Sequence, residues 1–427
     1  MYCWSCLRDN ALAAELIRRK HDVTLLPFYT PTLTDEENVS RKERIFFGGI
    51  SVYLEQHLPL FRHTPGMLDR LWDSPAVIRA LTSRSIAVDP KQLGAMTVST
   101  LKGEDGNQRK EIVKLLDWAT TEPRPDIVNI PYTLLICLAA PLKQALGCPV
   151  VITLQGEDLF LEGLPQPYRD ESLAEIRSRI KDVDLFIAVS EYYAAFMREY
   201  LGTPAARMRL ARLGVNVSDL PVSAKKRTDR FTIGYFARID PAKGLHNLAE
   251  AYLILRREKG LPESRLLAAG YLAPEHKPYL EAIRRDLRQA GLGEEFDYQG
   301  SVDRQAKVKF LHGIDVLSVP SPYREPKGLY LMEAMACGVP VVQPSHGAFP
   351  ELIARTGGGV LAASESPIDV ATALFELWRD PTRAAGLGRQ GAQGVRNHYT
   401  VAHMADEVLA AYDAAVRSEK SEVRSQK

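Results

Sequence analysis

Two glutamates eight positions apart, Glu325 and Glu333, are the side chains whose setting most needs a chemical explanation. Glu333 lies in the stretch 328–350, whose only other acidic or basic side chain is His346. A helix that began at Leu329 would be apolar on every side, which is typical of a buried helix. Because burying a carboxylate without a partner is costly, we expect Glu333 to reach a cavity and to accept hydrogen bonds there. The two glutamates are therefore a candidate site.

The loop that leads into this helix has the composition of an anion-binding site. If it delivers the chain into a helix, free backbone N–H groups gather around Lys327, Gly328 and Leu329, and a helix start with a glycine in its approach favours phosphate. Glu325 would flank the phosphate on one side. Glu333, about one turn into the helix at a rise of ~1.5 Å per residue, would flank it on the other. The competing interpretation is an acidic helix cap plus a glutamate paired with an internal arginine.

A second charged segment, GYFARIDPAKG at 234–244, follows a predicted strand and opens a helix. It places Arg238 and Lys243 at the carboxyl end of that strand, where ligands bind in open α/β sheets. An arginine fork and a compact lysine charge suit a diphosphate leaving group. A surface loop with ordinary charges is the alternative.

Composition excludes several classes of protein. Among 427 residues, 54 are basic and 53 acidic, so the clustered positive charge of a nucleic-acid binder is missing. The longest apolar run, 134–142, is too short to span a bilayer, and the start lacks a signal-peptide core. Five cysteines argue against a disulfide framework, and Cys3 and Cys6 are expected to be free thiols. We expect a cytoplasmic protein; a weak, peripheral contact with a membrane surface stays open.

Short apolar strands alternate with helical stretches along the chain. Such strands, joined by helices, indicate an α/β protein with parallel sheets covered on both faces. A helix is expected at 10–20. The predicted strands are 21–26, 45–47, 126–130, 149–154, 185–189, 232–236, 265–269, 316–319 and 339–342.

The array of strands is too long for one doubly wound sheet. A polar, turn-rich segment at 220–230 separates two Rossmann-like domains, 1–220 and 228–400. An amphipathic helix follows at 401–417, which could cross back to the N-terminal domain. Residues 418–427 are expected to form a frayed polar tail.

The N-terminus departs from this plan, because a doubly wound domain normally opens on a strand and this chain opens on a loop and helix. Either the first strand is encoded upstream of the assigned Met1, or another segment fills its place in the sheet. We favour a start assigned too late. Sequencing the N-terminus of the intact protein tests this, and an authentic Met1 on a stable, active protein would contradict it.

Taken together, these segments resemble the retaining glycosyltransferases of family 4 (glycosyl transferases group 1). The resemblance covers roughly 125–400 and implies the GT-B fold, in which two Rossmann-like doubly wound domains face a cleft. The matching pieces, in order, are VDLFIAVS at 183–190, LGVN at 213–216, FARIDPAKG at 236–244, Gly300 in YQGSV, VPS at 319–321 and EPKGLYLMEAMACGVPVV at 325–342.

The resemblance implies a role for each matching residue. Glu325 would lie at the transferred sugar and Glu333 at the nucleotide ribose, while Arg238 and Lys243 would bind the diphosphate. The domain 228–400 would bind the nucleotide sugar. The other donor-binding residues would be Lys327, Gly328, Leu329 and Gly300.

The N-terminal domain, 1–220, would hold the acceptor, which we expect to be a carbohydrate or a lipid-linked sugar. A distant similarity to the glycine-containing region of starch and glycogen synthases places Gly48 and Gly49 on the acceptor or sugar side. Gln155 would join them, standing where the family commonly has a histidine. Glutamine can bind a sugar hydroxyl but cannot shuttle a proton.

The chemistry suits these residues. Negative charge grows on the diphosphate as the anomeric C–O bond breaks, so catalysis needs preorganised positive charge. Arg238, Lys243 and the amides at Gly328 and Leu329 would supply that charge without a metal ion or cofactor. In the retaining mechanism usually proposed for this family, the acceptor proton passes to the departing phosphate, and no dedicated protein base is obligatory.

Two further features have structural interpretations. Asp182-Val183-Asp184 spells a metal-binding pattern of another glycosyltransferase fold, but it stands at a helix-to-strand junction and is read as a cap and surface charge. His346 is interpreted as a satisfied loop histidine, because no carboxylate near it in sequence supplies a partner. Two alternatives to hexosyl transfer stay open: a catalytically silent relative that binds nucleotide sugar, and a disaccharide synthase or phosphorylase of the same fold.

Overall fold

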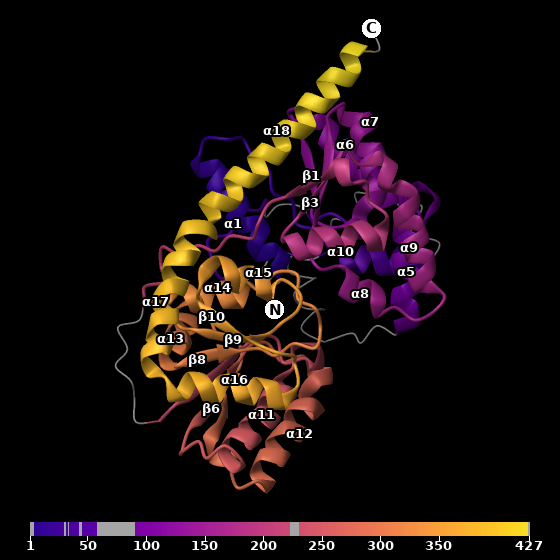
Figure 1. Ribbon diagram of the computed structural model, residues 1–427. Helices are drawn as coiled ribbons and strands as arrows, with labels where there is room; N and C mark the ends of the chain where they lie inside the picture. Colours follow the sequence, from indigo (N-terminus) through magenta and orange to yellow (C-terminus); the bar gives the residue numbers. More distant parts are fainter. Residues whose placement is uncertain are drawn as a thin grey trace. The chain divides into compact units, whose positions relative to one another are not determined.

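The computed structural model describes residues 4–29, 31–32, 34–41, 45–57, 90–222 and 230–425. The chain forms two compact units (Figure 1). One runs from Leu213 to His403. The other combines the N-terminal part of the chain, up to Arg212, with the C-terminal helix from Met404 onward.

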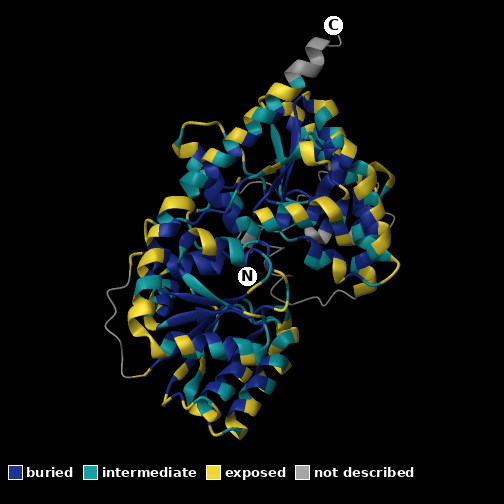
Figure 2. Cartoon of the chain, in the orientation of Figure 1, coloured by how far each residue is buried: buried dark blue, intermediate teal, exposed yellow. Residues whose placement is uncertain are grey.

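The unit 213–403 is built on a six-stranded parallel sheet of order β10-β9-β8-β5-β6-β7. Its helices flank the sheet, and the strands are largely buried (Figures 1 and 2). The strands are β5 (Thr232–Phe236), β6 (Arg265–Ala269), β7 (Phe296–Tyr298), β8 (Val316–Ser318), β9 (Val341–Pro344) and β10 (Gly359–Ala362). The helices are α11 (Leu245–Arg257), α12 (Lys277–Gln289), α13 (Arg304–Gly313), α14 (Leu329–Ala336), α15 (Phe349–Thr356), α16 (Pro367–Arg379) and α17 (Pro381–His398).

The unit that begins at the N-terminal end has a four-stranded parallel sheet of order β1-β2-β3-β4 in the described residues. The strands are β1 (Val128–Ile130), β2 (Val150–Leu154), β3 (Leu185–Ala188) and β4 (Met208–Leu210). The helices are α1 (Trp4–Arg18), α2 (Gly49–His57), α5 (Pro90–Leu101), α6 (Arg109–Thr121), α7 (Ala139–Leu146), α8 (Asp158–Glu162), α9 (Tyr168–Arg179), α10 (Glu191–Leu201) and α18 (Val401–Ser425). Apolar side chains from the sheet and from helices such as α6 and α10 form one core.

The central strands were predicted well. The predicted strands 232–236 and 265–269 agree residue for residue with β5 and β6. The strand predicted at 339–342 begins later, at Val341, because the Val339 amide still bonds to the Ala334 carbonyl at the end of α14.

The strands predicted at 21–26 and 45–47 are wrong. The only pairing there, within the described residues, is an isolated parallel bridge between Phe28 and Phe46. Tyr29 and Phe47, which follow the bridged residues, have φ angles of 63° and 52°. This left-handed backbone turns each segment away from a ladder.

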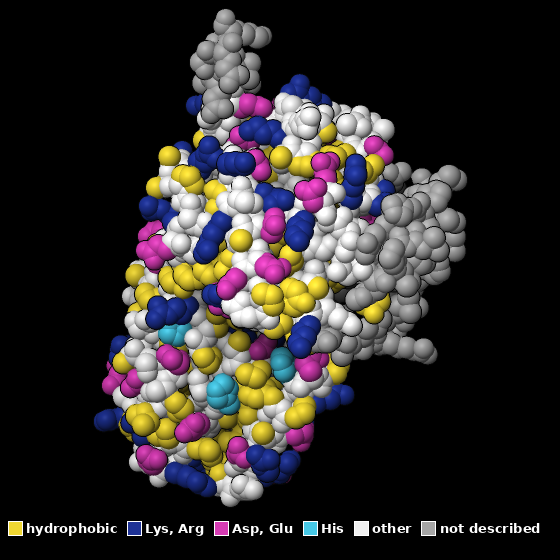
Figure 3. Space-filling view, turned by 90° about the vertical axis from the view of Figure 1, so that its right-hand side faces the viewer, with side chains coloured by type: hydrophobic (Ala, Val, Ile, Leu, Met, Phe, Trp, Pro, Cys, Tyr) yellow, Lys and Arg dark blue, Asp and Glu magenta, His cyan; other side chains and the backbone are white. Residues whose placement is uncertain are grey.

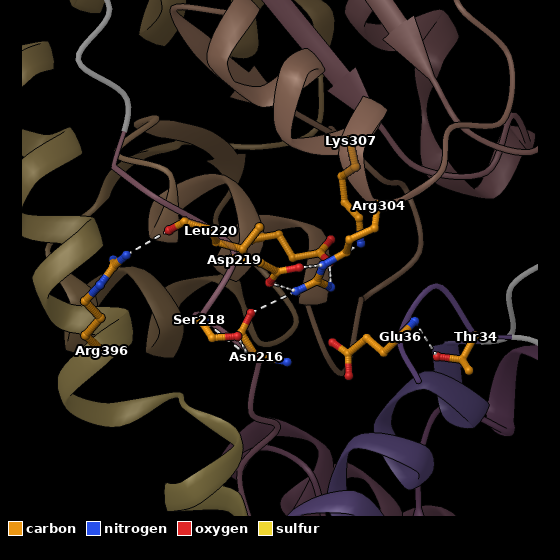
Figure 4. Close-up of polar contacts among 10 residues, drawn as sticks. Thr34, Glu36, Asn216, Ser218, Asp219, Leu220, Arg304, Lys307 and Arg396 are labelled. Atoms are coloured by element: carbon orange, nitrogen blue, oxygen red, sulfur yellow. Dashed lines mark hydrogen bonds and ion pairs between the residues drawn. The ribbon is translucent and has the colours of Figure 1, made fainter. Parts of the chain in front are cut away.

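The boundary between the units differs from the predicted one. The prediction divided the chain between 220 and 228, whereas the compact units divide after Arg212. The reason is a set of contacts that hold the residues after Arg212 to the unit 213–403 (Figure 4). Arg304 bonds to the Asn216 carbonyl at 3.0 Å and to Asp219 at 2.6 Å, and Arg396 bonds to the Leu220 carbonyl at 2.8 Å.

The C-terminal helix is longer than predicted. It continues to Ser425, through the segment expected to fray. Residues 401–425 contain neither glycine nor proline, so nothing in the sequence ends the helix at 417. Among the helices that the structure describes, none combines the length and the apolar character that crossing a bilayer requires.

The outer surface carries charges of both signs. On the face shown in Figure 3, basic and acidic side chains of the described residues are interspersed. This distribution agrees with the near-equal numbers of basic and acidic residues in the sequence.

Candidate functional site

Loops from three neighbouring strands meet at the carboxyl edge of the six-stranded sheet. β5 leads into a 3-10 turn, Pro241–Lys243, and β8 leads into the loop before α14. β9 leads into a third loop, before α15. The carboxyl edge is where open α/β sheets bind ligands, and most of the predicted donor-side residues lie here.

Lys243 and Glu325 form a buried ion pair. Each side chain is 8% exposed, and Lys243 Nζ donates to Glu325 Oε2. The 3-10 turn that carries the lysine is fixed by Asp240, whose carboxylate accepts from the Ala242 amide at 2.9 Å. The turn ends at Gly244, with φ of 74°, where a Cβ atom would lie 2.0 Å from the Pro320 carbonyl oxygen. The structure therefore pairs two residues to which the family resemblance gave different roles, Glu325 at the transferred sugar and Lys243 at the diphosphate.

Glu325 is a carboxylate at neutral pH. Burial acts to raise its pKa, but Lys243, the Lys327 charge and the Lys327 backbone N–H hold that pKa below its ordinary value. A buried carboxylate that stays charged is suited to accept hydrogen bonds from sugar hydroxyls. It is not suited to donate a proton.

The loop after β9 holds the backbone of Glu325 in place. Ala348 donates its amide to the Glu325 carbonyl at 2.8 Å. Gly347 has φ of 61°, and a Cβ atom there would lie 2.7 Å from the Glu325 carbonyl oxygen and 2.8 Å from its nitrogen. Position 347 therefore requires glycine, whereas Ala348, with φ of −82°, does not.

The helix start predicted at Leu329 is confirmed. Gly328 precedes it with φ of 66°, and its carbonyl accepts from the Leu331 amide at 3.0 Å. All eight residues of α14 are buried, as the apolar pattern predicted. The first amides of a helix have no carbonyl partner within it, so this start presents N–H groups directly after Glu325 and Lys327.

Glu333 has a partner that the sequence did not reveal. Its Oε1 accepts from Lys307 Nζ at 2.6 Å, and Arg304 Nη1 lies 3.9 Å from the same oxygen. The expectation that hydroxyl or amide donors would surround Glu333 is thus wrong for this oxygen. Glu333 Oε2 is buried and has no hydrogen-bond partner among the described residues.

A helical pattern could have singled out Lys307, although not the acid with which it pairs. Lys307 shares the buried face of α13 with Phe310 and Leu311, at spacings of three and four residues. A lysine at such an apolar position signals a buried acid elsewhere. Arg304, one turn earlier, is fixed by Asp219 in a bidentate pair at 2.8 and 2.6 Å (Figure 4).

Arg238 and Gly300 lie at the same edge of the sheet but apart from this pair. Arg238 follows β5, is 33% exposed and lies 3.6 Å from Asp240. Gly300 follows β7, and its carbonyl accepts from the Gly270 amide at 2.9 Å. A Cβ atom at Gly300 would meet nothing within 4 Å, which leaves open space above this strand end.

A second polar cluster lies at the carboxyl edge of the four-stranded sheet. Gln155 follows β2, and its Nε2 donates to the Pro131 carbonyl at 3.1 Å. Its backbone amide donates to Glu157 at 2.8 Å, and Glu157 also accepts from the Thr133 amide at 3.2 Å. Burial raises the pKa of Glu157. Gln155 is thereby held in place, while its Oε1 has no partner among the described residues.

Comparison with known proteins identifies the family. The model of glycosyl transferases group 1 matches residues 218–394, and that of glycosyltransferase family 4 matches residues 102–219. The chain is a group 1 glycosyltransferase. Glycogen synthase of Mycobacterium tuberculosis is 25% identical over 300 residues, which cover 70% of each chain.

Solved structures show that this glycosyltransferase has the GT-B fold of two parallel α/β domains. Sucrose-phosphate synthase from Thermosynechococcus elongatus is 21% identical and matches with a TM-score of 0.62 over 73% of this chain and 79% of that chain. HepE from Anabaena, solved with UDP-glucose, is 17% identical and has a TM-score of 0.62 over 92% of this chain and all of that chain.

His346 was interpreted as a loop histidine whose ring nitrogens are both hydrogen-bonded, and this interpretation is wrong. Both ring nitrogens are buried, and neither makes a well-formed hydrogen bond within the described residues. A carboxylate does face the ring: Glu365 Oε2 lies 3.7 Å from Nε2, and it comes from a segment beyond α15. Burial lowers the pKa of His346, so the ring is neutral near pH 7.

The remaining predicted residues lie apart from these clusters. Phe47, next to Gly48, donates its amide to the buried Glu111 carboxylate at 3.0 Å. Gly49 begins α2, and no hydrogen bond in the described residues links either glycine to Gln155. Asp184 accepts from the Val150 amide at 2.8 Å and pairs with Lys143. No group of metal ligands occurs among the described side chains.

Proposed function

We propose that this glycosyltransferase transfers a hexose from a nucleotide-diphosphate sugar to a carbohydrate or lipid-linked acceptor, with retention of the anomeric configuration. The observation that carries the proposal is the buried Lys243–Glu325 pair just before the N-terminus of α14. It brings a cation, a carboxylate and helix-start amides together at the ligand-binding edge of a parallel sheet.

The diphosphate would be held by these donors. An ammonium group has three N–H donors, and Glu325 engages Lys243 through one carboxylate oxygen. The other ammonium hydrogens and the first amides of α14 would bind phosphate oxygens, with Arg238 at the rim. Charge that grows on the leaving diphosphate is stabilised by such preorganised donors. We therefore propose a reaction that needs neither a metal ion nor a cofactor.

The two glutamates would hold the donor at its two ends. Glu325, kept ionised by Lys243, would accept hydrogen bonds from the transferred sugar. Glu333 has one oxygen engaged by Lys307 and one buried oxygen without a described partner, and we propose that a ribose hydroxyl donates to the second. A buried acceptor left unpaired is costly, which is what supports a ligand at this position.

The proposed step exchanges two bonds at the anomeric carbon. The C–O bond to the diphosphate breaks as the bond to the acceptor oxygen forms on the same face. The acceptor proton passes to the departing phosphate oxygen. The protein supplies positioning and charge, and the low pKa of Glu325 fits a residue that takes no proton in this step.

Donor turnover tests the proposal. UDP-glucose, with which HepE was solved, is the first candidate, followed by other UDP, GDP and ADP sugars. We expect nucleoside diphosphate release by the wild type and about a 10²–10³-fold loss in Lys243→Ala and Glu325→Gln, the scale of losing one charge-stabilising group. Wild type that binds donor but turns over no faster than these variants is a silent binder. A product with inverted configuration by NMR would refute retention, and transfer to free sugar or phosphate would identify a disaccharide synthase or phosphorylase.

A further inference from the structure

The N-terminal helix α1 carries a buried guanidinium whose main binding face is unused. The Arg8 side chain is 1% exposed, and its Nη1 donates to Asp9 at 2.8 Å. Arg8 Nε and Nη2 are buried and have no hydrogen-bond partner in the described parts of the chain. These two atoms form the planar fork with which arginine grips two oxygens of one carboxylate or phosphate.

The side chain of Gln155, which has an unpaired acceptor, is linked to Arg8 through the Asp9 carboxylate. Gln155 Nε2 lies 3.3 Å from each oxygen of Asp9, so Asp9 connects the guanidinium to the amide. Gln155 Oε1 is also buried and without a described partner. Because Gln155 follows β2, both groups lie at the carboxyl edge of the sheet, where ligands bind. Asp9 is 19% exposed, so the cluster reaches solvent at this residue.

A purely structural role does not account for the arrangement. The pairing of Arg8 with its neighbour in sequence uses a single N–H group, and leaving the fork of a buried arginine empty destabilises a fold. Unsatisfied buried groups in native proteins call for an explanation such as an unobserved ligand. The surroundings are polar, since Asn129 donates to the Tyr412 hydroxyl at 2.8 Å. Burial raises the pKa of Tyr412, whereas the positive charge of Arg8 acts to lower it.

We propose that Arg8 and Gln155 form an oxyanion site for the acceptor. The fork of Arg8 binds a phosphate or carboxylate group of the acceptor, and Gln155 Oε1 accepts from one of its hydroxyl groups. This inference rests on the proposed function, because it specifies the acceptor as an anionic polyol or sugar. Anion binding itself can be tested without any donor.

The experiment uses the full chain and inorganic phosphate as the probe, with acetate in a parallel arm and ionic strength held constant with NaCl. Thermal unfolding is followed for the wild type, Arg8→Gln and the matched control Arg18→Gln. Arg18 lies on the same helix, is 69% exposed and pairs with Glu15. We expect phosphate, acetate or both to stabilise the wild type and the control. In Arg8→Gln the apparent Kd should rise by more than about tenfold, as for loss of a charge-assisted bidentate contact.

A second variant separates this site from the donor site, which also favours phosphate. Lys243→Ala should keep the Arg8-dependent response. If Lys243→Ala abolishes the response and Arg8→Gln leaves it intact, the anion binds at the donor site and the inference is wrong. Absence of any response in the wild type also overturns it.

The unliganded variants provide an independent readout. If Arg8 serves a ligand, removing its unsatisfied charge should leave the Tm of Arg8→Gln equal to or above that of the wild type. A lower Tm together with an unchanged phosphate response would assign Arg8 a structural role and refute the proposal. Glucose 6-phosphate and glucose are then compared as acceptors: preference for the phosphorylated sugar, lost in Arg8→Gln, supports the site. Failure of donor turnover would count against the proposed function and leave the anion result standing.

Discussion

Glu333 accepts from Lys307 through one carboxylate oxygen, and its other oxygen is buried without a hydrogen-bond partner among the described residues. Both ring nitrogens of His346 and the Oε1 atom of Gln155 are also buried without such a partner. Groups of this kind reduce the stability of the empty protein and are typical of ligand-binding sites. A buried polar atom without a partner therefore indicates a residue that serves ligand binding, whereas a fully paired one indicates a residue that serves the fold.

Replacing Lys307 with methionine tests how much the ion pair between Lys307 and Glu333 contributes to stability. Breaking a buried ion pair from one side leaves an uncompensated charge, so Lys307→Met should lower the free energy of unfolding by about 3–5 kcal/mol. Lys307→Met/Glu333→Met should recover most of this loss, because both charges are gone. Denaturation with urea measures each value. The control Arg284→Met removes an exposed pair with Glu281 and should change stability by no more than about 0.5 kcal/mol. If Lys307→Met changes stability as little as this control does, the ion pair between Lys307 and Glu333 does not stabilise the fold.

His346 should give stability a specific dependence on pH. Because burial lowers its pKa in the folded protein, the unfolded chain binds the proton first as pH falls below about 6.5. The stability that the neutral ring provides is then present above that pH and lost as pH falls through the lowered pKa. In His346→Gln, the decline of the unfolding free energy between pH 7 and 5 should be shallower than in the wild type. Parallel curves for the two proteins would refute this.

At the scale of the elements, the sequence predicted the central strands of both sheets and the edge strand β1, and it missed three other edge strands. β4, β7 and β10 lie at sheet edges and are only partly buried. Their exposed positions carry residues such as Arg209 and Asp297, so they lack the continuous apolar run that reveals a central strand. Long-range pairing was missed for a related reason: Lys307 and Glu365 are far in sequence from Glu333 and His346, and only the fold brings them into contact.

The loop 345–348 should be the most sensitive element of the donor side. In Gly347→Ala, the added Cβ would lie within 3 Å of the Glu325 backbone at a φ of 61°, so the loop must move and displace Glu325. We expect a loss of about 1–3 kcal/mol in stability together with weaker donor binding. Gly386→Ala in α17 is the control: a Cβ there meets nothing within 4 Å, and alanine in a helix should stabilise by up to about 1 kcal/mol. Calorimetry with the best donor compares the two, and equal donor affinity would refute the role of the loop.

At the scale of the whole molecule, both ends of the chain contribute to one unit. From Met404 onward α18 belongs with the N-terminal residues, as the prediction of a helix crossing back implied. Its buried side chains recur along one face, at Met404, Val408, Ala411 and Ala415. The Tyr412 hydroxyl on this helix accepts from Asn129 in the sheet. The donor-side residues, by contrast, all lie within 213–403.

Removing residues 404–427 should therefore separate the stabilities of the two units. The unit that contains β1 and α1 loses an apolar face, so its amides should exchange faster with solvent than in the intact chain. The amides of β5 and α14 should keep their protection, and the truncated chain should still bind the donor nucleotide, although transfer should fail. The control removes only 420–427 and should leave exchange unchanged, because Ala415 is the last buried residue among those whose burial the structure describes. Hydrogen exchange by mass spectrometry reports both units at once. Equal loss of protection in β5 and in β1 would show that the C-terminal helix stabilises the whole chain and not one unit.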